Sequence, residues 1–398
     1  MKQGEWNRRE FIVKPLVFAG AAGVLGRTES LVAQPATTPS GPLLTRMLGK
    51  TGISLPIVSM GVMNADIPGL LRRSYELGIR HFDTAASYQQ GRNEEMVGQV
   101  IKELGVRDKV IISTKQAVRN HHLPTEEGKE RFVRGVEASL ERLQMDHVDI
   151  LYSHAVDSPN HLKEEGHLQA LQALKKEGKA RFIGISTHNT VEVIPEAVKL
   201  NMFDVFLVTW NYTMAHDQEM LNIIKHAANS GIGIVAMKTQ AGGTVRPDPK
   251  LPKQLPLFSQ TALLKWVLNH EFVTTAIPGF STYQHLEQDF PVARDLAYTD
   301  EEKQFLADKA FAASAEFCHQ CGQCREDCPK RVDIPVLMRS HMYAVQYGNR
   351  ALARQTLAEL PIGKGIEACG SCDTCAASCR NSVRIARKID DLKALAFC

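Results

Sequence analysis

The sequence predicts an α/β protein, a (β/α)8 TIM barrel followed by a small helical domain that is rich in cysteine. Between residues 43 and 312, short apolar, β-branched runs alternate with longer stretches of helical pattern. The apolar runs are continuous, which is typical of parallel strands buried under helices. Beyond this segment the alternation stops, and eight of the nine cysteines follow in two identical spacings. Eight β-then-α units over this length indicate a closed barrel.

The strand-like runs recur along the whole barrel segment. They are Ile57–Gly61, Ile79–Thr84, Lys109–Thr114, Val148–Ser153, Ala180–Ile185, Val205–Trp210, Gly233–Met237 and Thr274–Pro278. A doubly wound open sheet is the alternative arrangement of such units. That fold usually carries G-x-G-x-x-G after its first strand, and the sequence has no such run there.

Helices are expected between these runs. The clearest helical pattern is Glu130–Leu143, whose apolar face is formed by Phe132, Val133, Val136, Leu140 and Leu143. Leu162–Lys176 and Gln218–Ala228 have similar patterns. Pro335–Leu360 is the helical middle of the C-terminal domain, and no alternating strands lie between the cysteine groups. We therefore expect a helical C-terminal domain rather than one built of β-hairpins.

The cysteines of the C-terminal domain follow one spacing twice. Both copies read C-x2-C-x2-C-x3-C, and they consist of Cys318, Cys321, Cys324 and Cys328, then Cys369, Cys372, Cys375 and Cys379. This spacing is typical of [4Fe–4S] clusters. Three cysteine thiolates with two residues between each can bind three of the four irons of a cubane cluster. The fourth cysteine is separated by three residues and can bind an iron that lies farther away. Two copies predict two clusters and a ferredoxin-like domain.

In two-cluster ferredoxins the fourth cysteine of each run serves the other cluster. By that precedent one cluster takes Cys318, Cys321, Cys324 and Cys379, and the other takes Cys369, Cys372, Cys375 and Cys328. Paired zinc sites and disulfides are the alternatives. Zinc sites usually separate their two ligand pairs by a longer stretch, and disulfides do not favour such dense triplets. Cys398 is left over without an assigned role.

Four polar residues stand at the carboxyl ends of three consecutive predicted strands. They are Asp83, Tyr88, Lys115 and His154. Barrel enzymes carry their catalytic residues at this rim. Taken one at a time, each residue has an ordinary structural explanation. The aspartate could cap a helix, the lysine could lie on the surface, the histidine could be a hydrogen-bonded core residue, and the tyrosine could simply pack against its neighbours. Together, at one rim, they predict an active site.

The chain here resembles the aldo/keto reductases. The resemblance runs from Arg46 to Gly279 and rests on "DTAASY", the strand-end lysine and the "LYSH" histidine. It implies carbonyl/alcohol interconversion of a small-molecule substrate, with a nicotinamide cofactor and the four residues above as catalytic tetrad. A phenol titrates near pKa ~10, and a neighbouring ammonium lowers that value. We therefore expect Lys115 to lower the pKa of Tyr88, while Asp83 holds the lysine and His154 orients the carbonyl.

The resemblance also implies the cofactor contacts. Ser186 matches the serine that contacts the nicotinamide amide, and Pro278, Gly279 and Ser281 lie in the loop that holds the nucleotide phosphates. Gly279 replaces the family's usual lysine, and Asp289 adds a carboxylate nearby, which weakens the case for a 2'-phosphate. The sequence is compatible with binding of NADP, with binding of NAD and with a loss of dinucleotide binding.

Together these features predict an oxidoreductase whose two clusters relay electrons between the barrel site and a redox partner protein or electron carrier. A non-catalytic electron-transfer or redox-sensing subunit, with the barrel as docking platform, is the alternative. The formal net charge of +3 gives no reason to expect a nucleic-acid partner. No internal apolar run approaches the length of a transmembrane segment.

The N-terminus resembles a twin-arginine signal. Asn7–Lys14 contains the arginine pair and a phenylalanine, and a small-residue apolar stretch follows over Pro15–Gly26. Export to the periplasm or beyond is the expectation, since this route carries folded, cofactor-loaded proteins; a cytoplasmic protein is the alternative. The predicted domains are a signal peptide at 1–35, a linker at 36–42, the barrel at 43–312 and the two-cluster domain at 313–398.

Overall fold

The structure is a computed structural model of the chain, and it describes residues 41–117, 124–242, 257–308 and 316–395. Several predicted features lie outside the described residues. They are the signal peptide at 1–35, most of the linker at 36–42, the domain boundary at 312/313 and Cys398. These stay predictions.

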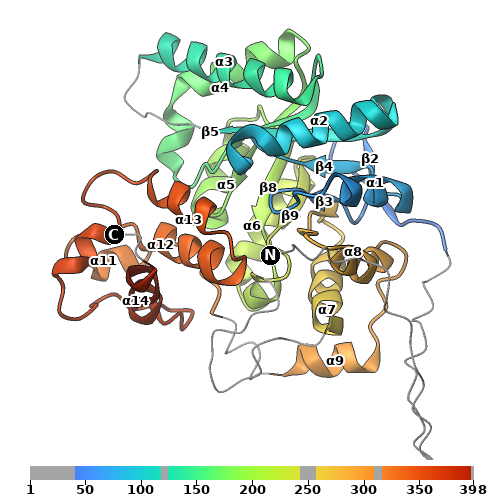
Figure 1. Cartoon of the computed structure of the whole chain (residues 1–398). Helices are drawn as coiled ribbons and strands as arrows, with labels where there is room; N and C mark the ends of the chain where they lie inside the picture. Colours follow the sequence, from blue (N-terminus) through green and yellow to red (C-terminus); the bar gives the residue numbers. More distant parts are fainter. Residues whose placement is uncertain (1–40, 118–123, 243–256, 309–315, 396–398) are drawn as a thin grey trace, which may run out of the picture. The chain divides into compact units, whose positions relative to one another are not determined.

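Eight parallel strands form a nearly closed barrel, in the order β3 to β10 (Figure 1). They are β3 Met60–Gly61, β4 His81–Asp83, β5 Ile111–Ala117, β6 Val148–His154, β7 Ala180–Thr187, β8 Val205–Thr209, β9 Gly233–Met237 and β10 Thr275–Ala276. The residues just before β3 hydrogen-bond to β10, from Ser59 N to Ala276 O at 2.8 Å and from Ala276 N to Ile57 O at 2.9 Å. The predicted TIM barrel is confirmed.

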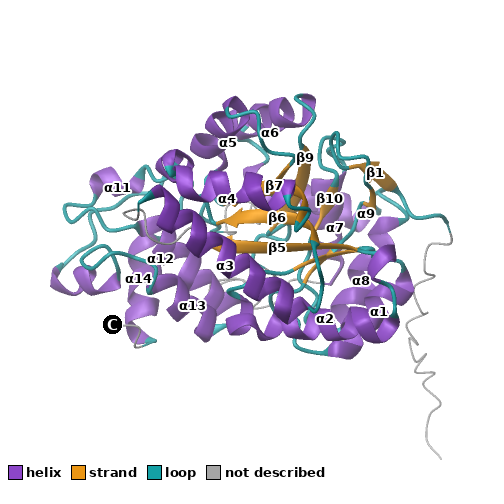
Figure 2. Ribbon diagram, turned by 90° about the horizontal axis from the view of Figure 1, so that it is seen from above, coloured by secondary structure: helices purple, strands orange, loops and turns teal. Residues whose placement is uncertain are grey.

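Nine labelled helices surround this sheet among the described residues up to 308 (Figure 2). They are α1 Pro68–Leu77, α2 Arg92–Leu104, α3 Thr125–Leu143, α4 Glu165–Lys176, α5 Thr190–Lys199, α6 Gln218–Asn229, α7 Leu257–Leu268, α8 Tyr283–Asp289 and α9 Asp300–Ala307. The three predicted barrel helices are confirmed. In α3, Phe132, Val136, Leu140 and Leu143 are buried, so the apolar face turns inward as expected.

A short hairpin that the sequence analysis missed precedes the barrel. It pairs β1 Thr45–Met47 with β2 Ser54–Pro56 in antiparallel register. Leu48 and Leu55, both fully buried, belong to the same apolar cluster as barrel-interior residues such as Val205. The hairpin therefore packs on the interior of the barrel. Strands of three residues are too short to give a recognisable pattern in the sequence.

The C-terminal domain is helical, as predicted, and its described residues contain no strand. Its elements are α11 Cys324–Asp327, α12 Ile334–His341, a π-helical turn Met342–Gln346, α13 Arg350–Leu357 and α14 Ile385–Ala394. Its own apolar core includes Val332, Leu337, Ile389 and Leu392. We call residues 316–395 the cysteine module. Across the described part of the chain, no helix combines the length and apolarity that a membrane span requires.

Candidate functional site

Lys115 is the centre of the predicted tetrad. It lies in β5 and is 1 % exposed. Its ammonium group pairs with the carboxylate of Asp83 and donates to Thr84 O at 2.6 Å and to the Tyr88 hydroxyl at 3.3 Å. An ammonium has three N–H donors, so every one of them has a partner here. The other oxygen of Asp83 accepts from Ser113 Oγ at 2.7 Å, which fixes the carboxylate.

Tyr88 and His154 complete the group. Tyr88 opens a 3-10 turn in which Gln89 and Gln90 have φ values of 50° and 59°. Such left-handed conformations are unusual for residues other than glycine, and they cluster at functional sites. The Tyr88 and His154 rings meet edge to face, with 5.8 Å between centroids. The structure thus brings all four predicted residues together.

One predicted property of this group is wrong. Burial raises the pKa of Tyr88 well above its ordinary value, and the charge of Asp83 acts in the same direction. Lys115 is paired with Asp83 at close range, and its charge does not outweigh these two effects. Burial also lowers the pKa of Lys115, and burial together with Lys115 lowers the pKa of His154 well below its usual range. Tyr88 is therefore a neutral phenol and His154 a neutral imidazole at neutral pH.

A cleft of about 570 Å³ opens beside Tyr88. Its barrel residues include Asp83, Tyr88, Leu207, Met237, Pro278, Gly279 and Ser281. Its remaining wall comes from the cysteine module and includes Gln346, Tyr347, Asn349 and Arg350. Ser186, predicted to contact the nicotinamide, is not among the lining residues, and its Oγ accepts a hydrogen bond from Ala155 N at 2.9 Å.

The end of the cleft beside the predicted nucleotide loop carries less negative charge than the sequence predicted. Asp289 is buried and accepts from Gln240 Nε2 at 2.7 Å, and burial raises its pKa to about 7. A carboxyl group that is partly protonated at neutral pH repels a phosphate less than an ionised one does. Arg350, which the cysteine module supplies, lines the same cleft.

The cysteines form two groups in the cysteine module. Cys328, Cys369, Cys372 and Cys375 line one cavity of about 360 Å³. All eight described cysteines are free, so the disulfide alternative does not hold in this structure. Within the described ranges, no three His, Cys, Asp or Glu side chains are grouped as one metal ion requires. The preference for clusters over zinc stays a prediction from the cysteine spacing.

The electrostatic neighbours of these thiols follow the same grouping. Burial and the nearby Cys379 and Cys321 raise the pKa of Cys318 to about 11. Burial and the nearby Cys328 and Cys375 raise the pKa of Cys369 to about 11. Half-buried thiols whose pKa values are raised in this way stay protonated unless a cationic core compensates their charge. This donor set fits iron–sulfur clusters, whose irons supply such a core.

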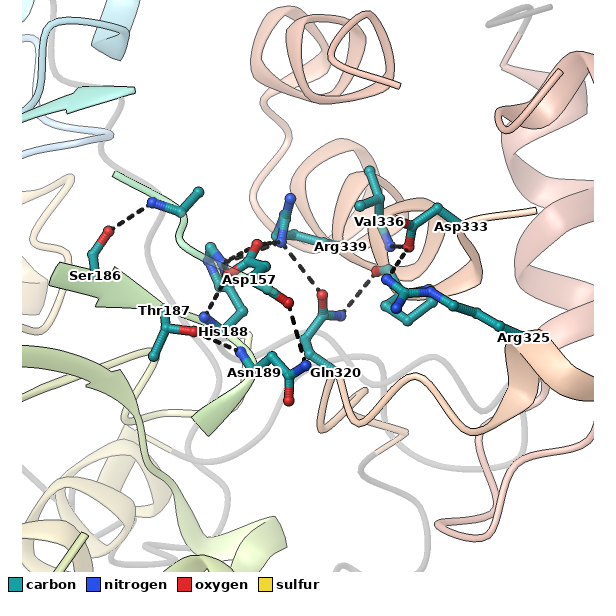
Figure 3. Close-up of polar contacts among 12 residues, drawn as sticks. Asp157, Ser186, Thr187, His188, Asn189, Gln320, Arg325, Asp333, Val336 and Arg339 are labelled. Carbon is teal, nitrogen blue, oxygen red and sulfur yellow. Dashed lines mark hydrogen bonds and ion pairs between the residues drawn. The ribbon is translucent and has the colours of Figure 1, made fainter. Parts of the chain in front are cut away.

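A buried ionic network joins the cysteine module to the rim of the barrel (Figure 3). Arg339 of α12 is 6 % exposed and donates to Asp157 Oδ2 at 2.6 Å. Asp157 Oδ1 accepts from the backbone N–H of His188 at 2.7 Å. Gln320, between Cys318 and Cys321, accepts from Arg339 at 3.4 Å and donates to Pro335 O at 2.9 Å. The network therefore connects a cysteine run to the loops after β6 and β7.

The charges in this network are strongly coupled. Burial alone would raise the pKa of Asp157, but His188 and Arg339 hold it well below its usual range. Burial, with Arg339 acting in the same direction, lowers the pKa of His188 to about 4. None of these three residues was predicted from the sequence. Asp157 and His188 carried a usable signal, because each closely follows a predicted strand, whereas Arg339 carried none.

A small cavity of about 20 Å³ lies between this network and the cleft. Its lining includes Cys318 on the cysteine side and Lys238, Thr209 and His188 on the barrel side. Lys238 lines the large cleft as well. The group of Cys318 is therefore the cysteine group that faces the barrel site.

Comparisons with known proteins agree with this architecture. Residues 62–255 match the model of the Aldo/keto reductase family, and residues 317–384 match that of the 4Fe-4S dicluster domain. The chain therefore contains an aldo/keto reductase domain and a 4Fe-4S dicluster domain. The likenesses described next are to aldo-keto reductases and indicate an oxidoreductase.

Three similar proteins illustrate the likeness. L-glyceraldehyde 3-phosphate reductase of Escherichia coli O157:H7 is 27% identical over 66% of this chain and 91% of its own length. The aldo-keto reductase AKR11C1 of Bacillus halodurans shares the fold, with a TM-score of 0.56, 23% identity and coverage of 70% and 99% of the two chains. The aldo/keto reductase of Klebsiella pneumoniae in complex with NADP and acetate has a TM-score of 0.51, 25% identity and coverage of 65% and 92%.

The buried network predicts a pH dependence of stability. The pKa of His188 is about 4 in the folded chain and near 6.5 in an unfolded one, so between these values the unfolded state binds more protons. The free energy of unfolding should therefore fall as the pH drops from about 6.5 to 4, by up to about 1.4 kcal/mol per pH unit from this residue. Chemical denaturation of His188→Asn should give a flatter dependence over that range. His216→Asn, at an exposed histidine, is the matched control. If the free energy of unfolding depends on pH equally steeply in the wild type and in His188→Asn, His188 is not the cause of the dependence.

Proposed function

We propose that this chain is an oxidoreductase that interconverts a carbonyl and an alcohol at Tyr88 and exchanges electrons with a redox partner through two [4Fe–4S] clusters. The observation that carries the proposal is the contact set of Lys115, which ties Asp83 and Tyr88 together beside the cleft. The cysteine module supplies part of the wall of that same cleft, so the two functions share one site.

The tetrad has separate tasks in the direction of reduction. When bound, a nicotinamide supplies a hydride to the carbonyl carbon. The π electrons of the C=O bond move to oxygen, and Tyr88 gives that oxygen its phenolic proton. The raised pKa of Tyr88 keeps it protonated and thus ready to donate. Lys115 lies next to the phenolate that remains, and neutral His154, whose ring contacts Tyr88 edge to face, is the proposed hydrogen-bond partner of the substrate oxygen although it is not among the cleft-lining residues.

The proposed nucleotide is NADP or NAD. Support comes from Pro278, Gly279 and Ser281, which line the cleft, and from the similar Klebsiella pneumoniae protein, which is in complex with NADP. The partly protonated Asp289 and the added Arg350 reduce the electrostatic objection to a 2'-phosphate. Since Ser186 lies outside the cleft lining, Leu207 and Met237 are the cleft residues left to contact the nicotinamide.

The eight cysteines are the proposed cluster ligands. One set is Cys318, Cys321, Cys324 and Cys379, and the other is Cys328, Cys369, Cys372 and Cys375. Bound clusters would supply one-electron transfer. The first set is on the barrel side, because Cys318 lines the small cavity with Lys238. Cys375 of the second set is exposed, so the redox partner is expected to meet that end.

Replacing Tyr88 by phenylalanine tests the proposed proton donor. Carbonyl reduction with NADPH or NADH should fall by about 10²–10⁴-fold, since the variant has no acid at that position. The EPR spectrum of the clusters should stay as in the wild type. Tyr75→Phe, on α1 and outside the cleft lining, is the matched control and should keep full activity. A Tyr88→Phe variant with wild-type turnover would exclude this role, and a wild type without any turnover would favour the docking-platform alternative.

Two double variants test the ligand sets. Cys318→Ser/Cys379→Ser removes two ligands of one proposed cluster, whereas Cys318→Ser/Cys328→Ser removes one ligand from each. Iron and acid-labile sulfide analysis after anaerobic purification should find about four of eight irons in the first variant. The second should lose both clusters or hold them in damaged form. If Cys318→Ser/Cys328→Ser instead keeps about four irons and Cys318→Ser/Cys379→Ser damages both clusters, each run of four cysteines binds its own cluster.

A further inference from the structure

Lys238 has an unusual position at the carboxyl end of β9. Its backbone has a φ of 55°, a left-handed conformation that lysine rarely adopts. Its ammonium group lies 5.4 Å from the centre of the Tyr343 ring, which belongs to the π-helical turn of the cysteine module. The side chain lines both the large cleft beside Tyr88 and the small cavity beside Arg339. Strained backbone at a site often accompanies function.

The charges around this lysine do not balance. The carboxylates that act on it are Asp157 and Asp83, and both are already engaged. Asp83 pairs with Lys115 and accepts from Ser113, while Asp157 pairs with Arg339 and accepts from His188. Over the residues that the structure describes, the ammonium group of Lys238 has neither a hydrogen bond nor an ion pair. Burial, with Arg339 acting in the same direction, lowers the pKa of Lys238 to about 7, so its ammonium form lacks a counter-ion and an anion bound beside it would stabilise that form.

Two buried hydroxyl groups beside Lys238 also lack partners. Thr209 and Thr239 are each 1 % exposed, and their Oγ1 atoms find no hydrogen-bond partner within the described ranges. Thr209 shares the small cavity with Lys238, and Thr239 shares the cleft with it. Buried polar groups are nearly always hydrogen-bonded, so the orphaned hydroxyls point to a polar ligand. A hydroxyl next to an ammonium is a suitable donor for an anion.

We propose that Lys238 binds a carboxylate on the substrate, so that the enzyme acts on small carbonyl compounds that carry this negative group near the carbonyl. The proposal rests on the proposed function, because it places the carbonyl at Tyr88. Lys238 and Tyr88 line the same cleft, and the charge of Lys238 acts on both Lys115 and His154. The phosphates of a nucleotide are the other possible source of such an anion, and the experiment separates the two.

The test compares pyruvate with pyruvamide, a neutral amide of nearly the same shape. Calorimetric titration of the cluster-loaded protein with saturating NADP should give at least tenfold tighter binding of pyruvate, the scale expected for a charge-assisted hydrogen bond. In Lys238→Met this preference should disappear while pyruvamide binding persists, and in Lys238→Arg it should be largely retained. Lys225→Met, at an exposed lysine of α6, is the matched control. Visible absorbance of the clusters and thermal unfolding verify that each variant is folded.

Equal binding of the two compounds by the wild type, including no measurable binding of either, would overturn the proposal. A preference that persists in Lys238→Met would do the same. If Lys238→Met instead weakens NADP binding tenfold and leaves the pyruvate preference unchanged, the lysine serves the nucleotide phosphates and the proposal fails. Binding is measured without turnover, so a lysine-dependent preference without alcohol formation would overturn only the proposed reductase function.

Discussion

The buried ion pair between Arg339 and Asp157 determines how the rest of the site is built. A charge removed from water is tolerated only when it is paired and hydrogen-bonded, and removing one partner of such a pair costs about 3–5 kcal/mol. Asp157 satisfies this requirement with His188 and Arg339 at once. Because Arg339 lies on α12, the pair fixes that helix to the rim of the barrel, and the following π-helical turn comes to lie against Lys238.

This arrangement changes the chemistry of the tetrad. The cysteine module covers part of the cleft with Tyr347 and Asn349, and Asn349 donates to the Asn64 side chain at 3.1 Å. The cover deepens the burial that raises the pKa of Tyr88, and Tyr343 and Tyr347 act on that pKa as well. Water exclusion also strengthens each electrostatic contact inside the cleft. The module is thus part of the barrel site as well as the proposed carrier of electrons.

Much of the fold and of the site follows from local sequence patterns. The continuous runs that end at Asp83, Lys115 and His154 predicted both the strands and the rim on which these residues meet, because parallel strands all end on one side. The cysteine spacing predicted two groups for a similar reason, since short intervals restrict where thiols can lie. Local patterns contain no information on contacts between distant segments, and so the partnership of Arg339 with Asp157 was missed. The pKa of Tyr88 was predicted in the wrong direction because burial is a property of the assembled fold.

The clusters and the tetrad are proposed to form one path for electrons between a redox partner and the substrate carbonyl. The most direct test of this path is a freeze-quench experiment without oxygen, in which chemically reduced protein carrying bound NADP is mixed with pyruvate. If the clusters and the tetrad form this path, the EPR signal of the reduced clusters should decay at the rate at which lactate appears, with about one lactate for every two cluster electrons and two protons from the solvent, since a bound NADP would need both electrons and one of those protons before it could supply a hydride. A cluster signal that persists while lactate forms, or decays without lactate, would contradict the account.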